Sequence, residues 1–396
     1  MREPDGAPSH GSRISKRIAP IDATRGCAML MVCLSHIKEH FESTAPWVHW
    51  FLLTITRVAT PTFLLLSGFV IGYLLRTDTR RMAGISLVDR ALFLLLVAHV
   101  LIGWDELQKL SLMHWLFGRA LITDAIAIAL FVAVLLRQAS TFMLITLGAT
   151  LCLGSWMLAL FINLQASWAV TLANTLFSSR GAAAGALDAP LIPYVGMFLV
   201  GMGLSRWSHQ ALLARADRGL ARRFFTIGGI AMLITAAGAA TWHFGKAHFM
   251  AMFADPESAL LIRQTLDPRS KWPPSPAYLI FYGGSGLLML AFLFNGWPAR
   301  LVEPLKRATS VIGRASLMCF VVQDWVLIQI PLMTGLYQVT SIPFWVAWFS
   351  VTLLLLYALA RAWDNANGNR FLTVGLKAWR RRRILAGVTP PNVAQQ

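Results

Sequence analysis

Four charged or titratable side chains lie inside two long apolar stretches near the start of the chain. Asp22, Arg25 and His36 fall in the first stretch, and Arg57 falls in the second. Each of these groups costs on the order of 2 to 3 kcal/mol at the centre of a bilayer on insertion scales, so it is rare there without a partner or a function. We therefore predict that these four residues form the catalytic set.

His36 is the member of this set best suited to move a proton. An imidazole titrates near neutral pH, so it can act as a general base or as a nucleophile. Arg57 could stabilise a developing oxyanion or hold an anionic donor. Glu39 at i+3 could orient the His36 ring, and His49 is an alternative base. His36 could instead be a histidine that is only hydrogen-bonded at the membrane edge.

The segment from His36 to His40 reads H-x-x-E-H, which is the pattern of one class of zinc peptidases. In that pattern the two histidines hold the metal and the glutamate activates water. A third ligand on a neighbouring apolar stretch is not evident. We therefore expect no metal, and a zinc peptidase is a minor alternative.

Other polar groups fall at a similar depth of the predicted membrane. Counting 1.5 Å per residue puts His36 about 8 Å below the outer edge of a hydrocarbon core about 30 Å thick. The same count puts Arg57, His99 and Asp124 about 12 to 13 Å below that edge. We therefore expect a polar cavity that opens outward, with His99 and Asp124 as supporting residues.

Each of these groups also has a purely structural alternative. Arg57 and Asp124 could form a buried ion pair, and His99 could be a hydrogen-bonded core histidine. Asp22 and Arg25 could simply pair across one helical turn. A relay of such groups could also belong to a secondary transporter, although the internal symmetry common in transporters is not visible in this sequence.

The composition places the chain among membrane proteins. Of its 396 residues 56% are hydrophobic and only 13% are charged, against about 25% charged in a typical soluble domain. The net charge of +17 is concentrated between apolar stretches, which favours a topology signal over nucleic-acid binding. All four cysteines lie inside apolar stretches, so we expect them to be small core residues.

The apolar stretches predict an all-α bundle of about ten transmembrane helices. They are residues 17–41, 47–75, 87–103, 115–136, 141–161, 189–207, 224–243, 276–297, 308–330 and 343–363. Clusters of Lys and Arg follow every second stretch, so we expect both termini to be cytosolic. Residues 1–16 and 380–396 are expected to be cytosolic tails, and residues 17–379 a single membrane domain.

Several segments resemble membrane-bound sugar acyltransferases. The first is R-x-x-x-I-D-A-T-R-G-C-A-M-L-M-V-C-L-S-H (residues 17–36), and PTFLLLSGFVIGYLL (residues 61–75) is similar to the second helix of such proteins. The later segments, with Lys271-Trp272-Pro273-Pro274-Ser275 the most specific, resemble the heparan-α-glucosaminide N-acetyltransferase catalytic-domain family. The acyltransferase-3 and glucan succinyltransferase groups share much of the first two helices. The chain departs from the pattern at Gln323, where many relatives carry a histidine; we keep Gln323 as a supporting residue.

The resemblance implies transfer of an acyl group, commonly acetyl from cytosolic acetyl-CoA, to a sugar hydroxyl or amine on the far side of the membrane. His36, which ends the D-x-x-R-G helix, then becomes the base or acyl carrier. The basic residues Arg76, Arg80, Arg81 and Arg90 become contacts for the CoA phosphates, although they serve equally as topology signals. The expected location is a bacterial inner membrane, and the expected partners are the lipid bilayer, an acyl-CoA and a glycan acceptor.

Overall fold

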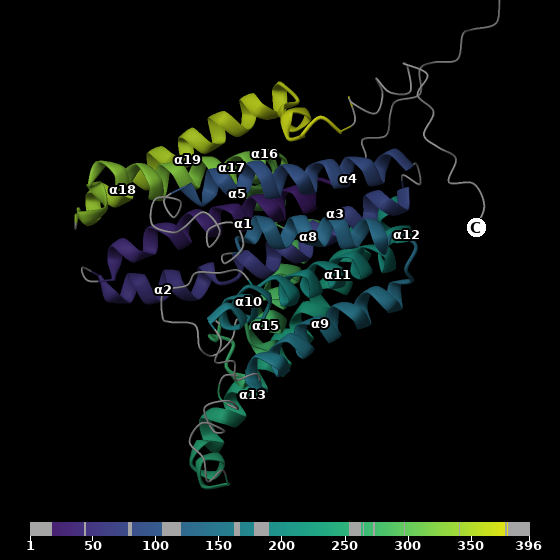
Figure 1. The fold of residues 1–396 in the computed structure, drawn as a ribbon, viewed down its shortest axis with the longest axis vertical. Helices are drawn as coiled ribbons and strands as arrows, with labels where there is room; N and C mark the ends of the chain where they lie inside the picture. Colours follow the sequence, from purple (N-terminus) through teal and green to yellow (C-terminus); the bar gives the residue numbers. More distant parts are fainter. Residues whose placement is uncertain are drawn as a thin grey trace, which may run out of the picture.

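The computed structural model describes residues 18–42, 45–77, 81–104, 120–161, 167–177, 190–252 and 263–378, the last apart from 264, 272–273, 297, 340 and 377. The two predicted tails, residues 1–16 and 380–396, lie outside these residues. The described chain is helical, with no strand in it (Figure 1). The main elements are α1 (Ala19–Ile37), η1 (Lys38–Phe41), α2 (Pro46–Thr56), α3 (Ala59–Thr77), α4 (Arg81–Phe93), η2 (Leu94–Ala98), α5 (His99–Ile102), α8 (Ile122–Leu135), α9 (Thr141–Phe161), α10 (Ser167–Phe177), α11 (Leu191–Trp207), α12 (His209–Leu213), α13 (Asp217–Met252), α15 (Pro276–Asn295), α16 (Ala299–Arg314), α17 (Ser316–Asp324), η3 (Trp325–Gln329), α18 (Ile330–Thr334), η4 (Leu336–Gln338), α19 (Ile342–Asn365) and η5 (Gly368–Phe371).

The predicted polytopic helical bundle is confirmed. Seven helical stretches of the described chain are long and apolar enough to cross a membrane, and the shorter α8 and α11 are also apolar. The more polar α1 takes its place among them in the same bundle (Figure 1). The ten predicted stretches therefore correspond to α1, α2 with α3, α4 with α5, α8, α9, α11, α13, α15, α17 with α18, and α19. The predicted core cysteines are free thiols, buried or half-buried.

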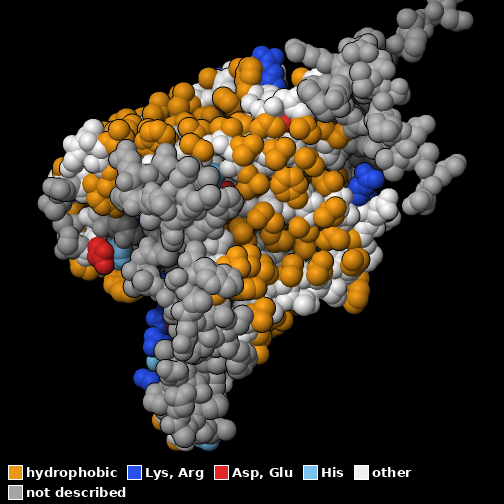
Figure 2. Space-filling view, viewed as in Figure 1, with side chains coloured by type: hydrophobic (Ala, Val, Ile, Leu, Met, Phe, Trp, Pro, Cys, Tyr) orange, Lys and Arg blue, Asp and Glu red, His pale blue; other side chains and the backbone are white. Residues whose placement is uncertain are grey.

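Lipid-facing helices carry the apolar surface that such a bundle requires. In the windows that could span a membrane, α13 and α19 are only 17% buried. Leu233 and Leu354 on these helices each have a relative exposure of 71%. Figure 2 shows a broad cover of hydrophobic side chains over the bundle, with the visible Lys and Arg side chains at its margins.

Hydrogen bonds join several of the segments that connect the helices at one end of the bundle. Arg206, at the end of α11, donates hydrogen bonds to the backbone carbonyls of Arg137 (2.8 Å) and Ala139 at the end of α8. Asp89, in the first half of the continuous helical stretch formed by α4, η2 and α5, accepts the backbone N–H groups of Val374 and Leu376 at 3.2 and 3.1 Å. The C-terminal segment therefore lies at the end of the bundle where α4 begins. We call this the basic end.

The second predicted helix is wrong in one respect, because the structure divides it in two. α2 ends at Thr56 and α3 begins at Ala59, with Arg57 and Val58 in the turn. Pro61 supplies the cause, since a proline has no N–H for the carbonyl four residues earlier and its ring clashes with that carbonyl. Here that carbonyl belongs to Arg57.

The predicted stretch 308–330 is also divided. The helix ends at Arg314 and restarts at Ser316, so the crossing helix runs from Ser316 to Thr334 and α16 is a separate amphipathic helix. α16 packs along the first half of α1. A side chain on Gly26 would overlap the carbonyl of Thr309, and one on Gly313 would overlap that of Asp22. Small residues thus let the two backbones approach closely.

Candidate functional site

His36 lies at the end of α1 opposite the basic end. It occupies the last turn of α1, and its side chain is half-buried. Lys38, two residues later, and Lys271, just before α15, are its charged neighbours. The His49 ring nitrogen Nδ1 lies 3.0 Å from the Lys38 carbonyl, which ties the start of α2 to the end of α1. His49 therefore has a structural contact, whereas His36 sits among charged groups from two elements.

Arg57 is held at the α2–α3 break beside two tyrosines. Tyr278 Oη donates a hydrogen bond of 3.3 Å to the Arg57 carbonyl that Pro61 leaves without a helical partner. The Arg57 guanidinium interacts electrostatically with the hydroxyls of Tyr278 and Tyr282. Its buried Nε has no hydrogen-bond partner among the described residues. Arg57 thus keeps a donor for another ligand.

A short polar segment before α15 connects to both groups. Asp267 and Arg269 interact electrostatically with Tyr282, and Lys271 interacts with His36. Asp267 accepts hydrogen bonds from the Arg269 backbone N–H (2.9 Å) and guanidinium (2.9 to 3.1 Å). Burial would raise the pKa of Asp267, but the bonds from Arg269 hold that pKa below its ordinary value, so the carboxylate stays charged.

The structure does not favour the alternative of an ion pair between Arg57 and Asp124, because Asp124 pairs with His99. Asp124 Oδ2 lies 2.7 Å from His99 Nδ1, and both side chains are buried. The same oxygen accepts the Leu121 backbone N–H at 2.8 Å, which caps the start of α8. The alternative of a hydrogen-bonded core histidine therefore describes His99, and the pair fixes α5 against α8.

Gln323 is fully buried on α17. Its Nε2 donates to the Phe320 carbonyl at 3.1 Å, and its Oε1 has no partner among the described residues. Cys319, one turn earlier, interacts with Cys33 of α1, one turn before His36. Gln323 thus lies at the level of His36 on the adjacent helix.

The H-x-x-E-H segment has a different arrangement from a zinc site. His40 stacks on Trp345, with ring centroids 3.4 Å apart and planes inclined by 12°. The Glu39 side chain lies outside the described ones. Among the described side chains, no three His, Cys, Asp or Glu residues are grouped as a metal site would need.

A second polar cluster lies nearer the basic end of α1. Arg25 donates a hydrogen bond of 2.7 Å to Ser316 Oγ at the α16–α17 break, and Asp22 is its charged neighbour. Arg90 of α4 is close enough for its positive charge to act on Arg25. Arg25 Nε is buried without a hydrogen-bond partner in the described chain. Two arginines with a free donor suit a polyanionic ligand such as a phosphate group.

The predicted group of four CoA-binding arginines is only partly described. Arg76 is exposed, and its positive charge acts on Arg206 and His209. Arg90 is instead an electrostatic neighbour of Arg25. Arg80 and the side chain of Arg81 lie outside the description. Partial burial, together with the positive charge of Arg76, lowers the pKa of His209.

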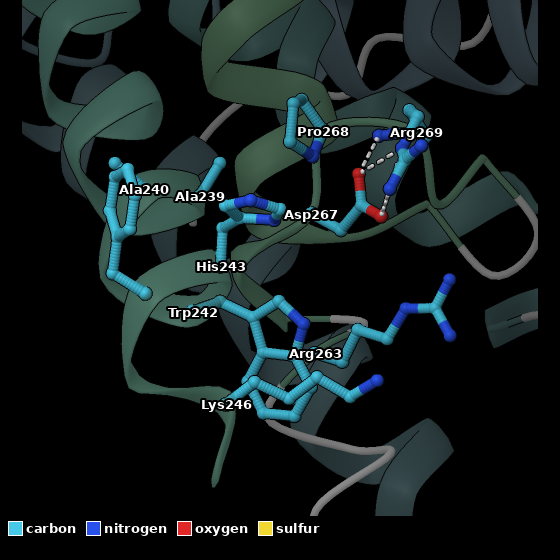
Figure 3. Close-up of a pocket in the computed structure, with 10 residues that line it drawn as sticks. Ala239, Ala240, Trp242, His243, Lys246, Arg263, Asp267, Pro268 and Arg269 are labelled. Carbon is cyan, nitrogen blue, oxygen red and sulfur yellow. Dashed lines mark hydrogen bonds and ion pairs between the residues drawn. The ribbon is translucent and has the colours of Figure 1, made fainter. Parts of the chain in front are cut away.

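A cavity of about 940 Å³ lies where α13 meets the polar segment before α15. Figure 3 shows side chains of α13 facing those of the later segment across it. Its polar and aromatic lining consists of Trp242, His243, Phe244, Lys246, Arg263, Asp267 and Arg269. The sequence analysis did not identify this pocket or the two tyrosines. The sequence feature that could have pointed to this region is the Lys271-Trp272-Pro273-Pro274-Ser275 segment, which lies next to the pocket residues Asp267 and Arg269. Trp272 and Pro273 are outside the described residues.

A comparison with family models matches residues 18–361 to the acyltransferase-3 family, described as an acyltransferase domain. This match covers most of the chain and every polar group discussed above. It does not identify the chain with the narrower heparan-α-glucosaminide N-acetyltransferase family. No curated protein and no solved structure matches the chain.

Proposed function

The chain belongs to the acyltransferase-3 family and is a membrane acyltransferase, and on that premise we propose the direction and substrates of the transfer. The acyl group, acetyl in the first instance, comes from a cytosolic acyl-CoA. The acceptor is a hydroxyl or amine of a sugar at the opposite face. The basic end of the bundle is the cytosolic end, in keeping with the positive-inside rule, and a bacterial inner membrane is the proposed location.

The arrangement of α1 is the observation that carries this proposal. Arg25, in the first half of α1, has an arginine neighbour and a free donor. His36, in the last turn, faces the polar segment at the other end. The two residues are 11 positions apart, which is about 16 Å along a helix. One helix thus carries a group suited to the donor and a group suited to the acceptor.

The polar cluster around Arg25, nearer the basic end, supplies the donor site of this proposal. The CoA phosphates bind to Arg25 and Arg90, since arginine binds phosphate oxygens through charge-assisted hydrogen bonds. Asp22 keeps Arg25 oriented and partly balances its charge. Ser316 lies 2.7 Å from the guanidinium and fixes its place between α1 and α17.

His36 and Arg57 supply the groups that carry out the acyl transfer. His36 takes the proton from the acceptor hydroxyl or amine, whose oxygen or nitrogen attacks the thioester carbonyl. The developing oxyanion is stabilised by Arg57. The carbon–sulfur bond then breaks, and the proton passes to the CoA thiolate as the new ester or amide forms. If His36 carries the acyl group in between, its imidazole nitrogen first attacks the thioester carbonyl and the carbon–sulfur bond breaks. The acceptor then attacks the acyl-imidazole, the carbon–nitrogen bond to His36 breaks as the ester or amide forms, and the acceptor proton passes to the CoA thiolate.

Thioester consumption tests the proposal. Purified protein in detergent should release free thiol from acetyl-CoA or succinyl-CoA when a glycan acceptor is added. The variant Arg25→Gln with Arg90→Gln should raise the KM for acyl-CoA, while Arg218→Gln with Arg222→Gln, two exposed charges on α13, should leave it unchanged. Absence of thioester loss with every short-chain donor, together with ion flux in liposomes, would instead establish the transporter alternative.

A further inference from the structure

The cavity beside α13 has a fixed wall. Trp156 Nε1 of α9 donates a hydrogen bond of 3.1 Å to Thr265 Oγ1, and Leu266 packs on Gly238 of α13. Backbone bonds from Ser270 N to the Asp267 carbonyl and from Ser275 N to the Ser270 carbonyl close the segment. The wall is thus anchored to three helices, because Ser275 also caps α15.

The lining of this cavity has a net positive charge. Among the described residues that line it, three side chains are cationic, Lys246, Arg263 and Arg269, and one is a carboxylate, Asp267. Arg269 pairs with Asp267 at 2.9 Å. No carboxylate of the described chain forms an ion pair with Lys246 or Arg263. Within the described part of the chain, Lys246 and Arg263 therefore present positive charge to the cavity, and the charge of Arg263 also acts on Asp267.

The shape and the aromatic lining suit a sugar. The volume of about 940 Å³ lies in the usual range for small-molecule sites. Trp242 comes from α13 and lines the cavity together with Lys246 and Arg263 (Figure 3). Its half-buried indole offers a flat apolar surface on which a sugar ring can pack.

The wall of the cavity is also connected to the neighbours of the reacting groups. Arg269 lines it, and Lys271, two residues further on, is the charged neighbour of His36. The Cα atoms of residues 269 and 271 cannot be more than about 7 Å apart. Arg269 and Asp267 also interact with Tyr282, which in turn neighbours Arg57.

We propose that this cavity holds the acceptor through an anionic group on the sugar, a phosphate or a carboxylate, which binds Lys246 and Arg263 while the ring packs on Trp242. This inference rests on the proposed function, since it names the chemical class of its acceptor. A neutral sugar would leave both cations without a partner. The acceptor class is therefore an acidic or phosphorylated glycan.

Binding in the absence of acyl-CoA tests the inference separately from the transfer reaction. Calorimetry would compare glucose 1-phosphate and glucuronic acid with neutral glucose, using the full chain in neutral-lipid nanodiscs. We expect at least one acidic sugar to bind about tenfold or more tightly than glucose. The double variant Lys246→Gln with Arg263→Gln should lose this preference. The matched pair Arg218→Gln with Arg222→Gln, on the same helix at its other end, should keep it.

A variant that removes a negative charge instead of positive ones gives a second test. Asp267→Asn removes the negative charge, keeps an oxygen acceptor for the Arg269 N–H, and should tighten binding of the acidic sugar. His36→Ala should bind it as the parent does. Equal binding of glucose and both acidic sugars, or unchanged binding in the double variant, would overturn the inference. Stronger competition by phosphatidylglycerol than by glucose 1-phosphate would assign the cavity to a lipid headgroup and also overturn it. Acyl transfer to a neutral sugar alone would leave the proposed function intact and refute this acceptor class.

Discussion

Replacing Pro61 by alanine should leave the protein at least as stable but should lower its rate of acyl transfer. The alanine restores an N–H that can bond to the Arg57 carbonyl and removes the ring that keeps α2 and α3 apart. In the observed break Pro61 lies in the first turn of α3 and costs little, whereas in a continuous helix it lies in the interior, so alanine stabilises the continuous helix by about 3 kcal/mol relative to proline. It loses the 3.3 Å hydrogen bond from Tyr278, worth about 1 kcal/mol. The balance of about 2 kcal/mol favours a straighter helix.

Straightening moves Arg57 away from the two tyrosines, and a misplacement of about 1 Å in an active site can cost about 10²-fold in rate. Initial rates of thioester loss and thermal unfolding in detergent should be measured on the same samples. The control is Pro46→Ala, because Pro46 lies in the first turn of α2, where a proline is tolerated. We expect Pro61→Ala to unfold at the same or a higher temperature and to transfer about 10²-fold more slowly. Normal transfer by a stabilised Pro61→Ala would refute a role for the break.

Three further predictions concern packing, the buried pair and topology. Gly26→Ala should lower stability by about 1 to 3 kcal/mol in thermal unfolding because its methyl group meets the backbone of α16, whereas Gly229→Ala, which has open space, should not; equal stability of the two would contradict the close α1–α16 contact. Asp124→Ala should cost about 3 to 5 kcal/mol, since it leaves a buried histidine and a helix N–H without their acceptor; a cost under 1 kcal/mol would show that the pair is not structural. A cysteine at position 267 should react with an impermeant label from outside the cell and one at position 218 should not; the reverse pattern would invert the topology.

The layout of the helices could be predicted from the sequence because apolar length and loop charge are local properties. Counting residues placed His36 near one end of α1, in agreement with the structure. The same count could not predict partners, since depth does not specify which way a helix is rotated. Asp124 shares a layer with Arg57 by this count, yet it faces His99.

The breaks were harder to predict than the spans. Pro61 carries a visible signal for the turn at Arg57, but the surrounding apolar run of α2 and α3 conceals it. The break at Ala315 has no proline, and the amphipathic α16 passes directly into the apolar α17. The site residues of the segment before α15 depend on tertiary contacts with α13, which no local pattern records.

The transfer rate of His36→Ala tests the central claim most directly. His36→Ala and His49→Ala should be compared at matched expression and thermal stability, with acetyl-CoA and an acceptor. The account predicts a loss of about 10² to 10⁴-fold for His36→Ala if the imidazole is a base, and a larger loss if it carries the acyl group. His49, whose ring contacts the Lys38 carbonyl, should be the less sensitive position. Near-normal transfer by His36→Ala together with loss in His49→Ala would contradict the account.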